Sequence, residues 1–295
     1  MDDLHRWGGG EELRYDAVDA TSYACANLSA LAAMARQLGN SQDADYFSAY
    51  RKKSAAALNS ILWQGQTKSW RDRHPRTHQL APALTITTFY PFFAGAGMAG
   101  QMDVFREHLL NPQQFWLPYP VPALAKDQPG FDANGFWQGP SWPAATCHVV
   151  EGFASAAKEF DRTLVPQAAE LFRRAAGVHL QPRADFYERH NPIDGAPLSS
   201  FRDYMHSWWI DLIIRHAAGV MIREDGRVAI DPLPLGLEHF ELVGAPFGKG
   251  KLDVLWRNPD RAGGGEPGLL VRLNGRTIVS QRDFKPGDPA VPLPR

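Results

Sequence analysis

Hydrophobic positions recur at helical spacing through most of the first 218 residues. From residue 18 onward, one such series is Ala24, Leu28, Leu31, Ala35 and Leu38, and this spacing predicts a helix over 18–38. Small apolar residues also occupy the opposite side, so we expect this helix to be buried on most sides. Gly39 and Asn40 end it, and Ser41 caps the next helix, which reaches about residue 63 and is apolar on one face only. The two predict a hairpin with an inner and an outer helix.

The same pattern returns several times before residue 219. Further helices are predicted near 86–94, 100–110, 142–160, 164–179 and 201–218, which makes about seven in all. A long loop with several prolines, 111–141, interrupts the series. Strands do not alternate with these helices, so a doubly wound α/β fold is not expected.

The pattern changes at Gly219. From there to residue 295 the apolar runs are short and alternating, as in 252–256 and 269–273, and turn residues separate them. Asn274-Gly275 between two such runs is a strong hairpin signal. The sequence therefore predicts a helical domain over 1–218 and a small antiparallel β domain over 219–295. We expect the β domain to be a structural appendage, because it holds no cluster of catalytic residue types.

Composition and charge narrow the classes of partner. A net charge of −1 gives no electrostatic basis for binding nucleic acid or an anionic membrane. No run of 18 apolar residues exists to span a membrane, and the first residues lack the apolar core of a signal peptide, so a cytoplasmic protein is expected. The two cysteines, Cys25 and Cys147, fall inside helical patterns and are expected to be small buried thiols.

The most aromatic stretch is Phe136-Trp137-Gln138-Gly139-Pro140-Ser141-Trp142-Pro143, at the end of the long loop. Aromatic faces on a rigid turn suit stacking against the apolar face of a sugar. The alternative is a turn whose tryptophans pack beneath the next helix. From these residues alone, the packing interpretation is the better supported of the two.

A second candidate stretch, 185–195, is the loop with the most carboxylates beside aromatic residues. It contains Tyr187-Glu188-Arg189-His190 and then an Asn-Pro-x-Asp-Gly turn. Glu188 has aromatic and basic neighbours that would adjust its proton affinity, as a general base requires. A surface salt bridge between Glu188 and Arg189 explains the same residues, and both interpretations stay open. No His-Glu-x-x-His or Cys-x-x-Cys pattern occurs, so no metal site is expected.

Three stretches together resemble a known family. Phe136–Pro143 resembles the "(Y/F)W-(R/Q)-GP-x-WP" signature of six-hairpin α-glycosidases, which include family 63 glycoside hydrolases, mannosylglycerate hydrolase-like enzymes and, more distantly, trehalases. The segment 187–195 resembles their "YE-x-Y-(N/D)-P-x-TG" segment. Met1-Asp2-Asp3-Leu4-His5-Arg6-Trp7 resembles the end of their "ESG-M-D-(N/D)-SPRW" segment. The resemblance covers about residues 1–245 and implies a mainly α fold, an (α/α)6 barrel of helical hairpins.

The resemblance also implies a reaction and its residues. It implies inverting hydrolysis of an α-glucosidic or α-mannosidic bond in a small saccharide or glycoside, with neither a metal nor an organic cofactor. Asp2 is the implied general acid and Glu188 the implied general base. The implied substrate-binding residues are Arg6, Trp7, Trp137, Gln138, Gly139, Trp142 and Trp208.

Departures from the family pattern leave alternatives open. Leu4-His5 replaces Ser-Pro, His190 replaces an aromatic residue, and Gln138 stands where Arg is common; these changes leave the sugar preference undecided. The family barrel has twelve helices and the sequence predicts about seven, so we expect a chain that lacks the N-terminal part of the barrel. Two other functions remain: an inactive or carbohydrate-binding relative, and a sugar epimerase or isomerase that would use His190 or His206.

Overall fold

The computed structural model describes residues 15–180, 185–203, 207–222, 227–261 and 266–293. The chain divides into two compact units, one made of 1–162 and 173–206, the other of 163–172 and 207–295. Helix α5 (Val165–Gly177) runs through both sets of residues. The predicted domain boundary after residue 218 stays a prediction.

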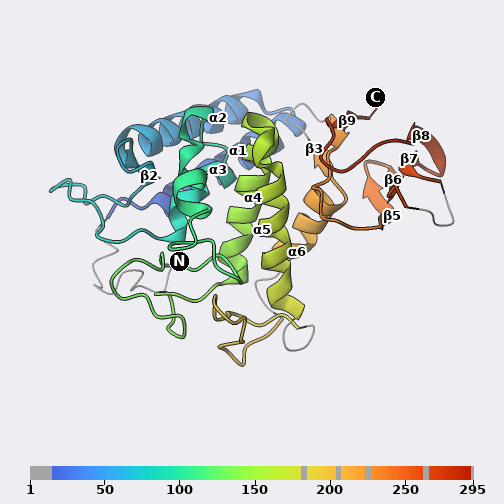
Figure 1. Ribbon diagram of the computed structural model, residues 1–295. Helices are drawn as coiled ribbons and strands as arrows, with labels where there is room; N and C mark the ends of the chain where they lie inside the picture. The colour runs from blue at the N-terminus through green and yellow to red at the C-terminus, as the bar shows by residue number, and fades with distance from the viewer. Residues whose placement is uncertain (1–14, 181–184, 204–206, 223–226, 262–265, 294–295) are drawn as a thin grey trace. The chain divides into compact units, whose positions relative to one another are not determined.

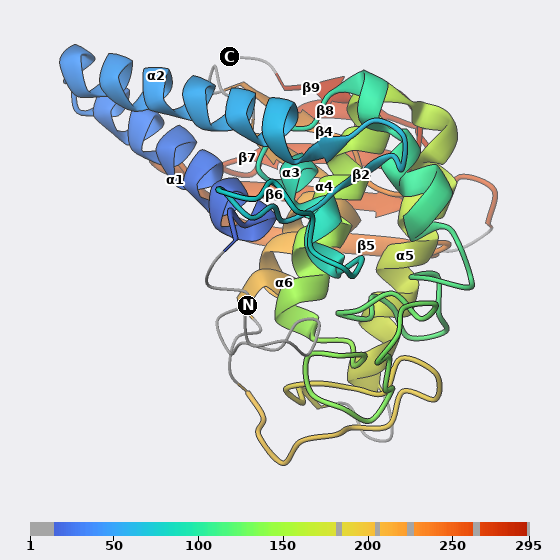
Figure 2. The ribbon, with the colours of Figure 1, turned by 90° about the vertical axis from the view of Figure 1, so that its left-hand side faces the viewer.

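The first unit begins with the predicted helical hairpin. Helices α1 (Val18–Gln37) and α2 (Ser41–Ala57) pack along each other, and α2 continues into a π-helical turn, η2 (Leu58–Leu62). Figure 2 shows the pair side by side. The Asn40 side chain accepts a hydrogen bond from the backbone N–H of Asp43 at 3.1 Å and caps α2. Counting η2 with α2, the predicted boundaries of both helices are confirmed to within one residue, but the predicted cap is wrong: Asn40 is the N-cap and Ser41 is the first helical residue.

Helix α1 is less buried than its sequence predicts. Its buried stripe runs through Val18, Ser22, Cys25 and Ala35, whereas Leu38, which follows the helix, is 84% exposed and Met34 is 58% exposed. The expectation of burial on most sides was therefore wrong. Small apolar residues on two sides of a helix permit burial, but in α1 the covered residues are those that face α2, α3 and the neighbouring short helices η2 and η3.

Helix α4 (Pro143–Phe160) is buried along most of its length. Residues on all its sides are buried, including Cys147, His148 and Phe153. It packs against α3 (Tyr90–Phe93) and the 3-10 helix η3 (Ile86–Phe89). Gly152 allows this close approach, because a Cβ there would lie 2.7 Å from the backbone nitrogen of Phe93.

Short elements connect these helices. A two-residue hairpin, β1 (Trp63–Gln64) with β2 (Ser69–Trp70), follows η2. The predicted helix at 100–110 is broken into η4 (Ala99–Gln101) and η5 (Phe105–Leu109). Two further 3-10 turns, η6 (Arg162–Leu164) and η7 (Val178–Leu180), flank α5. Figure 1 gives the course of the chain.

The second unit holds the last helix and two antiparallel sheets. The helix predicted over 201–218 begins later, as α6 (Ser207–Leu212), and ends in η8 (Ile213–Ala217). Its predicted start is wrong because Arg202 forms a β-bridge with Tyr187 and Asp203 has a φ of 62°. No helix among the described residues is long and apolar enough to cross a membrane.

The sheets confirm the predicted β region. One sheet joins β3 (Val220–Ile222), β4 (Val228–Ile230) and β9 (Val291–Pro292). The other has the order β5 (His239–Phe247), β6 (Gly250–Arg257), β7 (Gly268–Leu273) and β8 (Arg276–Gln281). The predicted Asn274-Gly275 turn joins β7 to β8 with φ angles of 51° and 76°, as a two-residue hairpin turn requires. One face of the larger sheet is buried around Val254, Trp256 and Val271.

Candidate active site

The aromatic turn 136–143 leads directly into α4. Trp142 has an extended backbone and occupies the N-cap position of α4, and Pro143 is the first helical residue, a position that tolerates its missing N–H. The turn is closed by a hydrogen bond from the Asp132 backbone N–H to the Gln138 carbonyl at 2.8 Å. Only glycine fits at position 139, because a Cβ there would lie 2.0 Å from the Asp132 carbonyl oxygen.

The rings of this turn pack mainly against one another. Trp137 and Trp142 stack with centroids 4.0 Å apart and planes 12° apart, and Phe136 meets Trp142 edge-on at 5.0 Å. Trp137 is 7% and Trp142 2% exposed, whereas Phe136 is 40% exposed. The two tryptophans therefore form a backing layer, and Phe136 presents most of the accessible ring surface.

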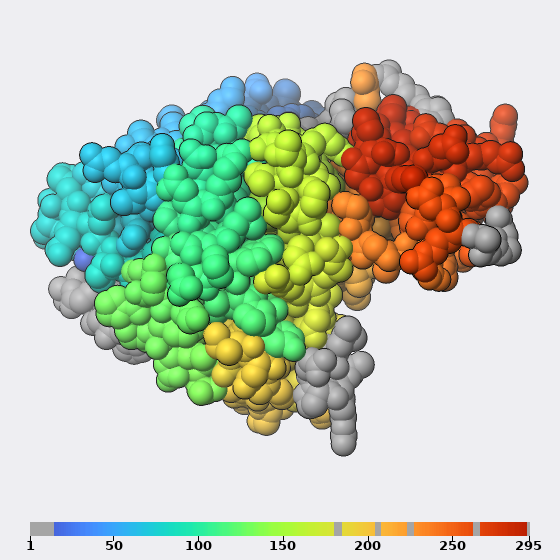
Figure 3. All heavy atoms as spheres, in the orientation of Figure 1, coloured from blue at the N-terminus to red at the C-terminus, as the bar shows by residue number. Residues whose placement is uncertain are grey.

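The turn is paired directly with the loop that carries Glu188. Ser141 and His190 exchange both backbone hydrogen bonds, each at 2.9 Å. The Ser141 hydroxyl donates to the Tyr119 carbonyl at 2.6 Å, and the Tyr119 N–H donates to the Pro192 carbonyl at 3.0 Å. Loop 111–141 and loop 185–203 thus lie side by side (Figure 3, green and gold). The two stretches that the sequence singled out are brought together.

The turn after Glu188 is fixed by its own side chains. The Asn191 side-chain oxygen accepts from the Ile193 N–H at 2.8 Å, and its amide group donates to Asn134 at 2.9 Å. Gly195 has a φ of 76°, and a Cβ there would lie 2.8 Å from the Tyr119 ring. His190 is fully buried, with Nδ1 3.2 Å from the Gly195 carbonyl oxygen. These contacts hold the loop as a rigid support.

The ends of the Glu188 loop are also tied together. Asp185 forms a 2.7 Å ion pair with Arg202, and Glu188 donates its backbone N–H to the Phe201 carbonyl at 3.0 Å. The hydrogen bond from Arg202, with another from the Phe186 N–H, holds the pKa of the Asp185 carboxyl below its usual value. The carboxylate form is therefore the one that closes the loop.

Glu188 itself is paired and enclosed. Arg189 Nη1 donates to Glu188 Oε2 at 2.7 Å, and the side chains of Arg189 and Glu188 are only 19% and 8% exposed, respectively. The Arg189 guanidinium carbon lies 4.8 Å from the ring centroid of Phe136 and 5.5 Å from that of Trp142, within cation–π range. The salt bridge considered from sequence does form, but it is enclosed by aromatic rings. The sequence placed Arg189 beside Glu188 but gave no sign of this aromatic shelf.

The remaining candidate residues lie within the aromatic turn, elsewhere on the chain or outside the described residues. Gly139 is buried and Gln138 half-buried within the turn. Trp208 is 38% exposed on α6, in the second unit. Asp2, Arg6, Trp7 and His206 lie outside the described residues. Within the described ranges, no group of three or more His, Cys, Asp or Glu side chains is arranged to hold a metal ion.

Comparison with solved structures gives the fold. A sialidase matches with a TM-score of 0.82 at 19% identity over 99% of this chain and 28% of its own. Mannosylglycerate hydrolase from Thermus thermophilus matches with a TM-score of 0.54 at 20% identity over 65% of this chain and 42% of its own. Neutral trehalase from Saccharomyces cerevisiae matches with a TM-score of 0.56 at 14% identity over 71% of this chain and 39% of its own. The chain spans less than half the length of each, and the predicted (α/α)6 glycosidase fold with a C-terminal antiparallel sheet region is confirmed.

Comparison with protein families identifies the chain more closely. The family described as the mannosylglycerate hydrolase MGH1-like glycoside hydrolase domain matches residues 2–207. The match includes both the aromatic turn and the Glu188 loop, and it agrees with the resemblance found in their motifs. The chain therefore belongs to the family of mannosylglycerate hydrolase MGH1-like glycoside hydrolase domains.

Proposed function

We propose that this chain acts as a glycoside hydrolase that cleaves an α-glucosidic or α-mannosidic bond in a small saccharide or glycoside, with inversion at the anomeric carbon. Glu188 is the general base and Asp2 the general acid. The observation that carries the proposal is the carboxylate of Glu188, which is enclosed, anchored by Arg189 and set beside an aromatic turn. Family membership supports the class of reaction.

The two carboxyl groups have complementary tasks in this reaction. The acid donates a proton to the glycosidic oxygen, while the base removes a proton from a water molecule that attacks from the opposite face of the sugar. Arg189 donates to one carboxylate oxygen of Glu188 and so fixes its orientation without itself exchanging a proton. A fixed base lowers the barrier because the attacking water is oriented before the reaction begins.

The aromatic turn supplies the apolar part of the site. The accessible ring of Phe136 offers a surface to the C–H face of a sugar, and the stacked Trp137 and Trp142 support it from behind. Gln138 supplies hydrogen bonds to hydroxyl groups. The Thermus thermophilus mannosylglycerate hydrolase has been solved with glucose and with D-glycerate, which supports a small glycoside as the substrate.

Histidine chemistry of the epimerase type is less well supported. His190 is fully buried and faces the carbonyl of Gly195 within its own loop. Its position accounts for the shape of the loop, and a buried ring has no path to a sugar.

The product of the reaction tests this proposal. The chain would be incubated with mannosylglycerate, trehalose and the 4-nitrophenyl α-glycosides of glucose and mannose, and the first-formed sugar followed by proton NMR. We expect at least one substrate to be cleaved, with the β-anomer appearing before mutarotation. Binding without turnover of any of them would favour a carbohydrate-binding relative, and an α-anomer as first product would contradict inversion.

A further inference from the structure

The outer face of the four-stranded sheet carries a hollow that the proposed reaction does not use. Side chains on β6 alternate between the buried face, with Leu252 and Val254, and the outer face, with Leu255 and Arg257. Leu255 is paired with Glu241 on β5 and with Leu270 on β7. Two leucines at the middle of the outer face thus form an apolar floor.

A glycine opens space beside this floor. Gly268 is the β7 partner of Arg257, so no side chain stands next to Arg257 on that strand. Gly268 has a φ of 82°, and a Cβ there would lie 2.0 Å from the Gln281 carbonyl oxygen, so the position admits only glycine. The resulting hollow has a volume of about 220 Å³. Clefts for drug-sized ligands measure roughly 300–1,000 Å³, so this hollow suits a single small ring.

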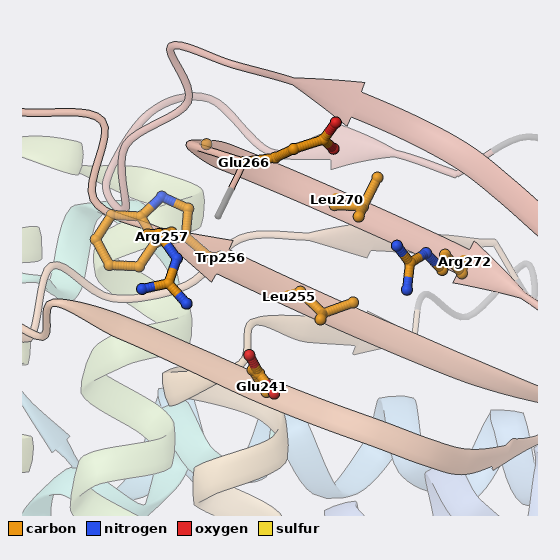
Figure 4. Close-up of a pocket in the computed structure, with 8 residues that line it drawn as sticks. Glu241, Leu255, Trp256, Arg257, Glu266, Leu270 and Arg272 are labelled. Carbon is orange, nitrogen blue, oxygen red and sulfur yellow. The ribbon is translucent and has the colours of Figure 1, made fainter. Parts of the chain in front are cut away.

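Charged side chains surround the floor on all sides. Arg257 and Arg272 stand at opposite ends of the leucine pair, with Glu241 on one flank and Glu266 on the other (Figure 4). Within the part of the chain that the structure describes, none of the four has a hydrogen bond or ion pair from its side chain. The guanidinium donors of the arginines and the carboxylate acceptors are therefore available to a ligand.

The balance of these charges indicates the class of ligand. Two arginines and two glutamates cancel, so an anion would gain from the arginines and lose to the carboxylates. A neutral polyol avoids this conflict, because each hydroxyl group both donates and accepts. An apolar floor with polar groups at its rim also fits the two faces of a sugar ring. We propose that this hollow binds a neutral saccharide, one ring at a time, at a site separate from Glu188.

Methyl NMR on the intact chain tests the proposal without any need for hydrolysis. Leucine methyl groups would be labelled with carbon-13 and titrated with D-glucose, D-mannose or maltose. The signals of Leu255 and Leu270, assigned through Leu→Ile variants, should shift saturably at millimolar sugar. Leu252, on the buried face of the same strand, should not shift. Because the readout is local, it is independent of the outcome at Glu188.

Variants of the two arginines complete the test. Arg257→Ala and Arg272→Ala should each raise the Kd for the sugar, measured from the leucine shifts, about tenfold. The cause is the loss of charge-assisted hydrogen bonds, and at a fixed sugar concentration the shift becomes smaller. Arg276→Ala, an exposed arginine on β8 outside the hollow, should leave it unchanged. The proposal is overturned if none of the three sugars shifts Leu255 and Leu270, if the shift survives in the double arginine variant, or if sodium D-glycerate binds there in preference to the neutral sugars.

Discussion

The Glu188 loop and the hollow on the outer sheet both gather arginine and glutamate side chains, but they differ in how those charges are satisfied. Arg189 is held by Glu188 and by two aromatic rings, and the pair is largely enclosed. Arg257 and Arg272 are half-buried on the open sheet without such partners among the described residues. The first arrangement is complete in the protein itself, whereas the second is completed only by a ligand.

This difference predicts that the Glu188 loop contributes to folding stability and that the charges around the hollow contribute to ligand recognition. Removing one partner of an enclosed ion pair destabilises the folded state, because it leaves the other charge in a poorly solvated place. An open rim charge contributes little to folding and is free to serve recognition. Substitutions of charged residues should therefore lower the free energy of unfolding at the Glu188 loop and change it little at the hollow.

The largest losses in the free energy of unfolding are expected from substitution of one glycine in each region. At Gly139 and at Gly268 an added Cβ would lie 2.0 Å from a backbone oxygen, and Gly268 also has a positive φ. Alanine at either position forces the backbone to move, at a cost of about 3 kcal/mol or more. Urea denaturation of Gly139→Ala and Gly268→Ala measures this, with Gly100→Ala, where nothing lies within 4 Å, as the control. A change below about 1 kcal/mol at both sites would show that the backbone yields easily at both glycines.

Replacement of Arg189 should give the second-largest loss in the free energy of unfolding. Arg189→Met keeps most of the side-chain volume but removes the cation that pairs with Glu188, and we expect a loss of about 3 kcal/mol. Arg189→Lys should recover part of it, since an ammonium retains the charge but not the planar stacking on Phe136. Thermal and urea unfolding measure both variants. Equal stability of Arg189→Met and wild type would contradict the view that the pair is enclosed.

Acid should weaken the helix that supports the aromatic turn. Burial lowers the pKa of His148 in α4 to about 4 from a usual value of 6.5. The folded state then binds fewer protons than the unfolded state between these values, so stability falls as the pH drops through 6.5 towards 4. Between pH 7 and pH 4.5 the loss attributable to His148 is about 2 kcal/mol.

The His148→Phe variant provides the control for this pH effect. It keeps an aromatic ring among Tyr23, Tyr90 and Phe93 but cannot take up a proton. Its free energy of unfolding should change by about 2 kcal/mol less than that of wild type over the same pH range. Parallel pH dependence of the two proteins would mean that His148 is not the group responsible.

The smallest change in the free energy of unfolding is expected for substitution of an arginine at the hollow on the four-stranded sheet. Arg272→Ala removes a half-buried charge with no described partner, so its free energy of unfolding should stay within about 0.5 kcal/mol of wild type. A loss comparable to that of Arg189→Met would abolish the contrast between the two regions.

Helices and turns that are specified by residues within their own stretch of sequence could be predicted. Hydrophobic spacing placed α1, α2 and α4, and Asn274-Gly275 placed a hairpin, because each signal lies within the element that it specifies. The start of the last helix was wrong, since Arg202 is drawn into a β-bridge with Tyr187. The burial of α1 was also wrong, because small apolar residues do not show which side a neighbour will cover.

The site could be predicted only in part. Motif resemblance singled out Glu188 and the tryptophans, but the backbone pair between Ser141 and His190 has no signature in either stretch. Such hydrogen bonds join main-chain groups that every residue other than proline carries. The shelf that Phe136 and Trp142 form for Arg189 depends on that same pairing.

Turnover by Glu188→Gln shows whether Glu188 is the general base. Glutamine keeps the shape of the side chain and can still contact Arg189, but it cannot accept the proton of an attacking water molecule. With the substrate that wild type cleaves best, we expect kcat to fall by about 10²–10⁴, with circular dichroism unchanged and with Glu159→Gln, an exposed carboxyl at the end of α4, at the wild-type rate. A folded Glu188→Gln protein with the kcat of wild type would show that Glu188 is not the general base.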